Sequence, residues 1–205
     1  MKNAAEGLRG LSWRMTSDEA LMLEFQGGSR AAFEELFARY RKPLYGFFGR
    51  RLNNSERAED LTQETFLAVI RAASRYEPRA SVRTYLYGIA LKLLAAERRK
   101  FLTSSTSGQS AAEPKTDGTP DCVLWVQQAL AKLDAPEREI LMLREYEQLS
   151  YSEIAELLRI PVNTVRSRLF RSRLALKSYL ESEAKSNPAL RASGELPHPR
   201  RRGMQ

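Results

Sequence analysis

A long polar segment divides this chain into two parts that must bury their apolar residues separately. Residues 103–121 read TSSTSGQSAAEPKTDGTPD and contain almost no large apolar side chains. Such a stretch cannot bury enough apolar surface to offset the conformational entropy that ordering it costs. The 205 residues are enough for two small domains. We therefore expect two domains joined by a flexible linker.

The expected organisation follows from this division and from composition. The parts are an N-terminal arm at 1–17, a first helical domain at 18–101, the linker at 102–121, a second helical domain at 122–184 and a disordered basic tail at 185–205. The tail contains several prolines and three consecutive arginines from Arg200.

Both domains are expected to be helical. Apolar residues recur at helical spacing, and no segment shows the sustained alternation of a strand. Residues 29–40 predict one helix, and Pro43 is expected in the first turn of a following helix. Ser55 and Ser81 are candidate N-caps of two longer helices. After the linker, two amphipathic helices are expected at 123–133 and 137–146. The predicted fold class is all-α, two small helical bundles on a tether.

Charge and cysteine content restrict the partners. The net charge is +8 and the pI about 9.8, which favours an anionic partner, either nucleic acid or an acidic membrane surface. One cysteine and one histidine, Cys122 and His198, make an intrachain disulfide impossible and a zinc site improbable, so we expect no metal, no cofactor and a reducing cytoplasm. No apolar run reaches about eighteen residues, so membrane insertion is not expected.

The strongest local pattern is a helix-turn-helix at residues 149–180. Ser150 and Glu153 form a capping box that begins a short helix ending at Leu158. Residues 159–161 break it, and a second helix is expected from 162 to 180. Ile154, Leu157, Val165 and Leu169 are expected to form a small core, with Ala155 where the two helices cross.

The second helix of this motif has the chemistry of a DNA reader. It carries five cations, and residues 161–180 contain no acid. Its leading residues would reach base edges in a major groove, and later arginines would meet phosphates. A solvated basic helix face is the alternative interpretation. The candidate DNA-binding residues are Asn163, Thr164, Arg166, Ser167, Arg168 and Arg171.

Longer segments resemble a known family. The second domain, with TVRSRLFRSR from Thr164, is similar to the C-terminal domain (region 4) of extracytoplasmic-function (ECF) sigma factors, although LuxR-type regulators have a related motif. The first domain resembles sigma region 2 in order and spacing, through AFEELFARYRKPLYGFFGRRL, AEDLTQETFLAVIRA from Ala58 and YEPRASVRTYLYGIA from Tyr76. The resemblance covers roughly residues 20–100 and 122–182. It implies core RNA polymerase and promoter DNA as partners.

For region 2, the resemblance implies that the helix at 55–75 docks on the clamp coiled coil of the polymerase β′ subunit, with the β subunit as a further contact. Acids on an otherwise basic protein suit a basic protein surface and repel DNA. First-turn acids that complement the helix dipole are the alternative explanation. The candidate docking residues are Glu59, Asp60, Gln63, Glu64, Phe66 and Leu67.

The resemblance further implies that region 4 reads the −35 element and that the segment at 79–100 captures unpaired bases of the −10 element. Cations and aromatic rings together are typical of single-strand binding. Tyr85 is expected mainly to pack, leaving Tyr87 for the strand. The candidate −10 residues are Arg79, Ser81, Arg83, Tyr87 and Lys92. Lys92 and Ala96 stand where the family usually has Asn and Asp, and Tyr85 where Trp is usual.

The expected function is therefore a sigma factor without catalysis of its own, restrained by an anti-sigma protein or by its own tail. A helix-turn-helix regulator that does not engage polymerase is one alternative, and it would normally be a symmetric dimer. An enzyme such as a nuclease is another, with a metal held by Glu59–Asp60 or Glu34–Glu35. Adjacent helix positions diverge by about 100°, which argues against these pairs.

Overall fold

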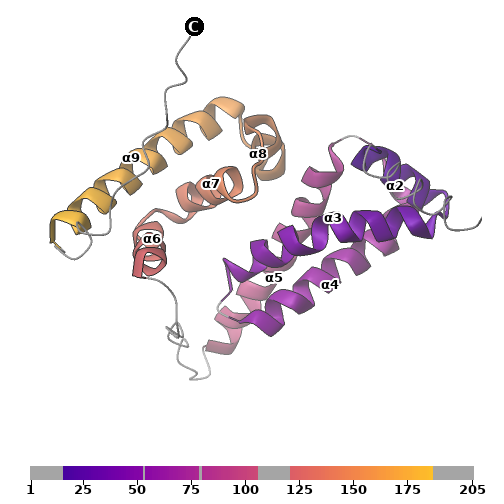
Figure 1. Cartoon of the computed structure of the whole chain (residues 1–205), viewed down its shortest axis with the longest axis horizontal. Coiled ribbons are helices and arrows are strands. Elements are labelled where there is room, and N and C mark those ends of the chain that lie inside the picture. Colours follow the sequence, from indigo (N-terminus) through magenta and orange to yellow (C-terminus); the bar gives the residue numbers. More distant parts are fainter. Residues whose placement is uncertain (1–15, 53, 79, 106–120, 187–205) are drawn as a thin grey trace, which may run out of the picture.

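The computed structural model describes residues 16–52, 54–78, 80–105 and 121–186. These residues form helices and no strand, which confirms the all-α prediction (Figure 1). The N-terminal bundle contains α2 (Asp18–Gln26), α3 (Arg30–Gly49), α4 (Ser55–Ala72), a short 3-10 turn η1 (Ala73–Arg75) and α5 (Val82–Ser105). The C-terminal bundle contains α6 (Asp121–Ala131), α7 (Ala135–Glu145), α8 (Tyr151–Leu158) and α9 (Val162–Ser186).

Helix α3 runs through the N-terminal bundle without a break. The prediction of two helices meeting near Pro43 is wrong, because Pro43 lies inside one helix of 20 residues. Leu36, Tyr40, Leu44 and Phe47 recur at helical spacing and are all buried against the neighbouring helices. This continuous apolar face offsets the one backbone hydrogen bond that an exposed proline cannot donate.

Local side chains cap the N-terminal ends of several helices. The prediction that Ser55 caps α4 is wrong by one residue, since the side chain of Asn54 accepts from the Arg57 amide at 2.9 Å. The prediction for Ser81 is confirmed, because its hydroxyl accepts from the Thr84 amide at 3.1 Å. Helix α2 was not predicted, although Ser17 caps it and acids occupy its first turn.

The helix-turn-helix prediction is confirmed. Ser150 and Glu153 form both hydrogen bonds of the capping box, and α8 ends at Arg159, whose φ of 54° is left-handed. Helix α9 continues to Ser186, beyond the predicted end. Ile154, Val165 and Leu169 are fully buried between α7, α8 and α9, as expected, whereas Leu157 is only partly buried.

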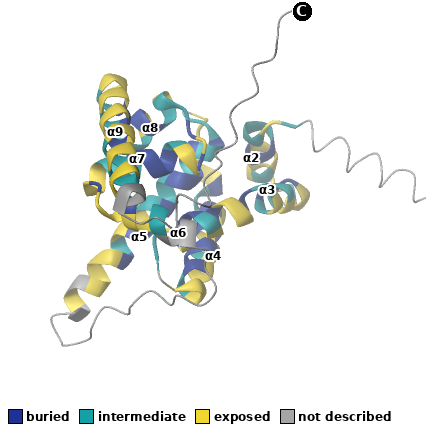
Figure 2. Ribbon diagram, turned by 60° about the vertical axis from the view of Figure 1, so that its left-hand side comes forward, coloured by how far each residue is buried: buried dark blue, intermediate teal, exposed yellow. Residues whose placement is uncertain are grey.

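The two bundles lie against each other through α5 and α8 (Figure 1). The Cδ1 of Leu157 on α8 comes within 3.6 Å of the place where a Cβ on Gly88 of α5 would be. This contact explains why Leu157 faces away from the core of its own bundle. The C-terminal part of α5 extends beyond the other helices and is largely exposed (Figure 2). None of the helices within the described ranges combines the length and apolarity needed to cross a bilayer.

Candidate nucleic-acid and polymerase interfaces

Helix α4 presents one exposed face and one buried face. Glu59 and Asp60 are 51% and 59% exposed at their side chains, and Gln63 is also exposed. Leu67 and Ile70 continue the same face one and two turns further on, at 47% and 46% exposure. These five residues, which we call the α4 stripe, combine acids, an amide and large aliphatic side chains on one surface.

Phe66 does not belong to this surface. It is 4% exposed and packs between Phe33 and Phe37 of α3, with ring centroids 6.1 and 4.7 Å away. The prediction that Phe66 contacts a partner is therefore wrong, because its position on the helix faces α3. Glu64 is partly exposed at 43% and pairs with Arg57 at 3.2 Å. Ile70 is the residue that the sequence analysis missed.

A groove of about 550 Å³ lies beside the α4 stripe, between α3 and α4. Its lining joins apolar rings and cations of α3 to polar residues of α4, namely Phe37, Arg41, Tyr45, Glu59 and Gln63. Arg41 pairs with Glu59 across it at 3.2 Å. The groove therefore adds a recess lined by rings and charged groups beside the α4 stripe.

The paired carboxylates considered as metal ligands have other partners. Glu34 and Glu35 each accept from a different arginine on α3, at 2.8 and 2.9 Å. Glu59 and Asp60 likewise pair with arginines on different helices, at 3.2 and 3.4 Å. Their charges are therefore compensated separately, and neither pair converges on one point.

Helix α4 is joined to α5 by a buried ion pair. Arg57 donates to both carboxylate oxygens of Glu97, through Nε at 2.7 Å and Nη2 at 2.8 Å. Glu97 is 6% exposed. The hydrogen bonds from Arg57 outweigh the effect of burial and hold the pKa of Glu97 below its ordinary value. This pair fixes the orientation of α4 relative to α5.

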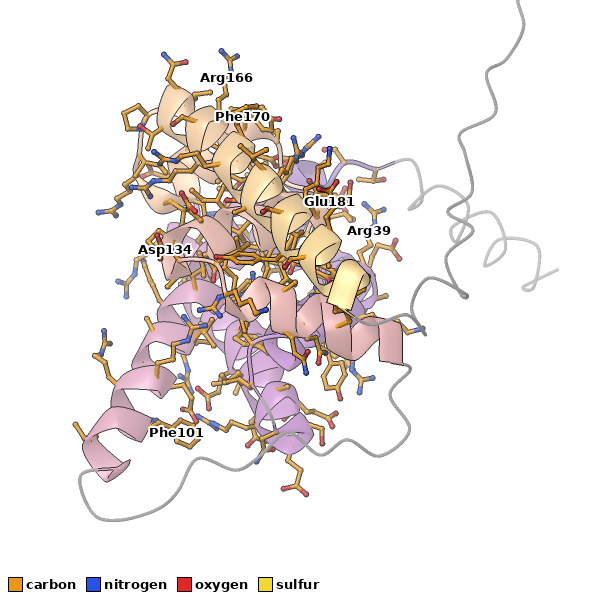
Figure 3. All side chains as sticks on the ribbon, turned by 90° about the vertical axis from the view of Figure 1, so that its left-hand side faces the viewer. Arg39, Phe101, Asp134, Arg166, Phe170 and Glu181 are labelled. Carbon is orange, nitrogen blue, oxygen red and sulfur yellow. The ribbon has the colours of Figure 1, made fainter. Side chains whose placement is uncertain are left out.

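The leading half of α9 forms the candidate DNA-reading surface. Asn163, Arg166 and Ser167 are exposed, and Arg166 projects outward near Phe170 in Figure 3. Thr164 and Arg168 are partly buried. All six candidates lie within the first ten residues of α9, where a recognition helix meets base edges.

Further along α9, ion pairs tie the helix to α7. Arg171 is 62% exposed at its side chain and its Nε lies 3.1 Å from Glu137. Arg173 is held similarly, 2.6 Å from Glu145. These contacts orient arginines at the edge of the surface, where phosphates rather than bases would be met.

The candidate −10 residues lie along α5, except Arg79, which falls outside the described residues. Ser81 and Arg83 stand at the beginning of α5 and are partly buried, whereas Lys92 is exposed. Tyr87 is 1% exposed, packing on Phe47 at 5.4 Å between ring centroids.

Tyr85 packs against the core as expected, whereas Tyr87 differs from its expected role. Tyr87 is the buried ring, and Tyr85 is partly exposed while packing on Tyr76 at 5.4 Å. The expectation that Tyr87 is the ring available to a strand is wrong for this arrangement of the chain. Burial and the nearby Glu147 raise the pKa of the Tyr87 hydroxyl above its ordinary value.

Glu147, in the loop between α7 and α8, is a central residue that the sequence analysis missed. Its side chain is 1% exposed and accepts from Arg50 at 2.9 Å with each oxygen. Arg51, itself 1% exposed, donates to it at 3.2 Å, and the Tyr87 hydroxyl donates at 3.2 Å. All three donors come from the N-terminal bundle. The donor and acceptor residues are too far apart in sequence for any local pattern to reveal them.

A second groove, of about 630 Å³, lies where α8 meets α5. Tyr85, Gly88 and Lys92 line it from α5, and Leu157 and Arg159 line it from the C-terminal bundle. The groove therefore contains a partly exposed ring and two cations, and both bundles contribute to it.

The comparisons with known proteins agree with this geometry. A family model described as Sigma-70 region 2 matches residues 36–100, and one described as Sigma-70, region 4 matches residues 124–176. The chain is 33% identical over 165 residues to RNA polymerase sigma factor CarQ of Myxococcus xanthus, covering 78% of this chain and 95% of that protein. It is 32% identical over 170 residues to ECF RNA polymerase sigma factor SigC of Mycobacterium tuberculosis, covering 80% and 91%.

Solved structures give the same fold. The chain is similar to CnrH in complex with the cytosolic domain of CnrY, with a TM-score of 0.64 at 24% identity, covering 82% of this chain and 99% of that one. Since two region models match in order and relatives above 30% identity span most of the chain, the family is established. This chain belongs to the sigma-70 family and is an RNA polymerase sigma factor of the extracytoplasmic-function group.

Proposed function

We propose that this sigma factor docks on the β′ clamp coiled coil of core RNA polymerase through the α4 stripe. The exposed stripe is the observation that carries this proposal. Leu67 and Ile70 are large aliphatic side chains held at the surface of a helix whose opposite face is completely buried. Exposed aliphatic residues beside acids suit a protein partner with a basic rim and an apolar centre.

The two bundles then divide promoter recognition between them. The leading turns of α9 read the −35 element as an intact duplex, because they offer polar groups and arginines to a major groove. Helix α5 holds the unpaired strand of the −10 element with cations and rings. The protein supplies no chemistry of its own, works in the cytoplasm, and drives strand opening by binding bases as they leave the stack.

An anti-sigma protein is the proposed regulatory partner. One solved structure that shares the fold is the sigma factor RpoE in complex with the anti-sigma factor NepR from Bartonella quintana, at 22% identity and a TM-score of 0.60. For this chain, the contact between α5 and α8 presents a compact body that one partner can grip on both bundles.

The test of docking uses Gln63→Arg and Leu67→Glu. Each change leaves the buried face of α4 intact. Gln63→Arg adds a positive charge to the stripe, and Leu67→Glu replaces an aliphatic side chain with a carboxylate. We expect affinity for core polymerase to fall by at least about tenfold, which corresponds to 1.4 kcal/mol. The measurement is a fluorescence titration of core polymerase, with helicity checked by circular dichroism.

Glu34→Arg is the matched control for this titration. Glu34 is 62% exposed on α3 and, among the described residues, pairs with its neighbour Arg30 in an i,i+4 contact. Charge reversal there should leave the affinity unchanged. Equal affinities for the wild type and for both stripe variants would refute docking through α4.

A further inference from the structure

Residues of region 4 form hydrogen bonds with the proposed strand-binding residues of region 2. Ser81 Oγ donates to Glu153 at the beginning of α8, at 3.1 Å. Arg83 donates to the backbone carbonyl of Glu147, and the Tyr87 hydroxyl donates to the Glu147 carboxylate at 3.2 Å. Three of the four described −10 candidates therefore make hydrogen bonds across the two bundles, and Leu157 of α8 packs at Gly88 between them and Lys92.

The centre of this contact is a carboxylate in a basic socket. Glu147 accepts from Arg50, Arg51 and Tyr87, and its side chain is 1% exposed. Arg50 also stacks over Tyr146, 4.8 Å from the ring centroid, and Arg51 also pairs with Glu139 of α7 at 2.9 Å. A buried carboxylate is costly unless it is paired and hydrogen-bonded. Here the donors belong to region 2, so the arrangement specifies one relative placement of the two bundles.

We propose that Glu147 is an internal latch, which holds the free sigma factor in a closed state where α8 and the α7–α8 loop cover the strand-binding face of α5. This inference rests on the proposed role of α5 in −10 capture. The carboxylate of Glu147 supplies Arg50 and Arg51 with the negative charge that a DNA phosphate would otherwise bring near them, and the backbone carbonyl of Glu147 engages Arg83. DNA and Glu147 therefore compete for one basic surface.

The latch is suited to opening because the attraction within its buried ion pair and the desolvation cost of that pair nearly cancel. Removing Glu147 and Arg51 from water costs much of what their attraction returns, so a buried pair contributes specificity more than net stability. When the bundles separate, both groups regain water. A competing partner on either bundle can then shift the population without breaking a large apolar core.

The closed state leaves the other two surfaces open. The residues of the α4 stripe are exposed, and so are Asn163, Arg166 and Ser167 on α9. The latched protein can therefore dock on polymerase and present its −35 reader, while strand capture waits for separation of the bundles. The latch therefore affects strand capture and leaves docking on polymerase unaffected.

The first experiment measures the distance between the bundles. Spin labels are placed at Glu34→Cys on α3 and Ser178→Cys on α9, in a Cys122→Ser background, because both sites are exposed. Double electron–electron resonance on the full chain should give one narrow, short distance. Glu147→Gln removes the charge with little change in shape, and Arg50→Gln removes a donor from the other bundle. Both should give a broad, longer distribution, whereas the control Glu181→Gln should not.

The second experiment measures whether the closed state blocks access of single-stranded DNA to α5. Binding of a fluorescent single-stranded DNA of randomised sequence is followed by anisotropy for the full chain. If the closed state holds about nine-tenths of the wild-type population, Glu147→Gln should bind about tenfold more tightly. Adding Arg83→Ala to Glu147→Gln should remove most of that gain, since it deletes a cation of the uncovered face.

The outcomes distinguish the latch from the function on which it rests. A broad distribution in the wild type, or an unchanged one in both Glu147→Gln and Arg50→Gln, overturns the latch. Longer distances without tighter DNA binding overturn occlusion. If the distance opens as expected but no variant transcribes or binds DNA when core polymerase is added, the latch stands and the proposed strand-capture role of α5 fails.

Discussion

Arg57 on α4 and Glu97 on α5 form a bidentate ion pair, in which the Arg57 Nε and Nη2 donate to the two carboxylate oxygens of Glu97 at 2.7 and 2.8 Å. Glu97 follows Ala96 on α5, and its carboxylate faces α4. The pair joins α4, the helix proposed to dock on polymerase, to α5, the helix proposed to hold the strand.

Glu97→Ala should destabilise the N-terminal bundle by about 2–3 kcal/mol, because it leaves Arg57 partly buried without its main acceptor. Arg57→Leu combined with Glu97→Leu should recover much of this loss, since the pair is then replaced by apolar contact. Urea unfolding followed by circular dichroism measures both. A loss no greater than that of Glu34→Ala would show that the pair is not structural.

The contribution of Glu97 should depend on pH in one direction. Arg57 holds the pKa of this carboxyl below its ordinary value. The stabilisation is therefore complete above the unfolded-state pKa of about 4.3 and is lost as the pH falls through the folded-state pKa. The difference in unfolding free energy between wild type and Glu97→Gln should be constant near neutrality and should shrink below about pH 4. A difference that persists down to about pH 3 would contradict this assignment.

Asn54, and not Ser55, should carry the cap of α4. Asn54→Ala removes the side chain that accepts from the Arg57 amide and should cost about 1 kcal/mol. Ser55→Ala is the matched control and should cost only a few tenths, since Ser55 is the first residue of the helix. Thermal unfolding of both variants tests the difference. Equal losses would mean that the cap position has been misassigned.

Two arginines of α9 should differ in how they bind the promoter. Arg166→Ala should cost about 1–3 kcal/mol and change the preference among promoter sequences, because Arg166 is placed to reach base edges. Arg171→Ala should weaken binding equally for all sequences and reduce the slope of log affinity against log salt by about 1. Electrophoretic shift assays of holoenzyme on several promoters give both quantities. Identical sequence preferences in Arg166→Ala and wild type would exclude base reading by this residue.

Much of the local structure could be predicted from the sequence. The capping box of Ser150 and Glu153, the break at Arg159 and the helices on either side depend on residues a few positions apart. The exposed face of α4 also has a local signal, and strict helical spacing from Gln63 to Leu67 and Ile70 could have separated Phe66 from it. Pro43 shows the limit, because burial of Tyr40 and Leu44 on either side overrides a local helix breaker.

The sequence by itself determined that this chain forms two helical bundles, one with an acidic helix and the other with a basic helix, because each of these features depends on composition and on a period of a few residues. The tertiary structure alone decided which side of each helix is available. Tyr87 is buried and Tyr85 is not, since Phe47 and Glu147 meet the first ring. The socket for Glu147 joins residues nearly a hundred positions apart, and an ion pair between two bundles follows no sequence period, so only folding brings these charges together.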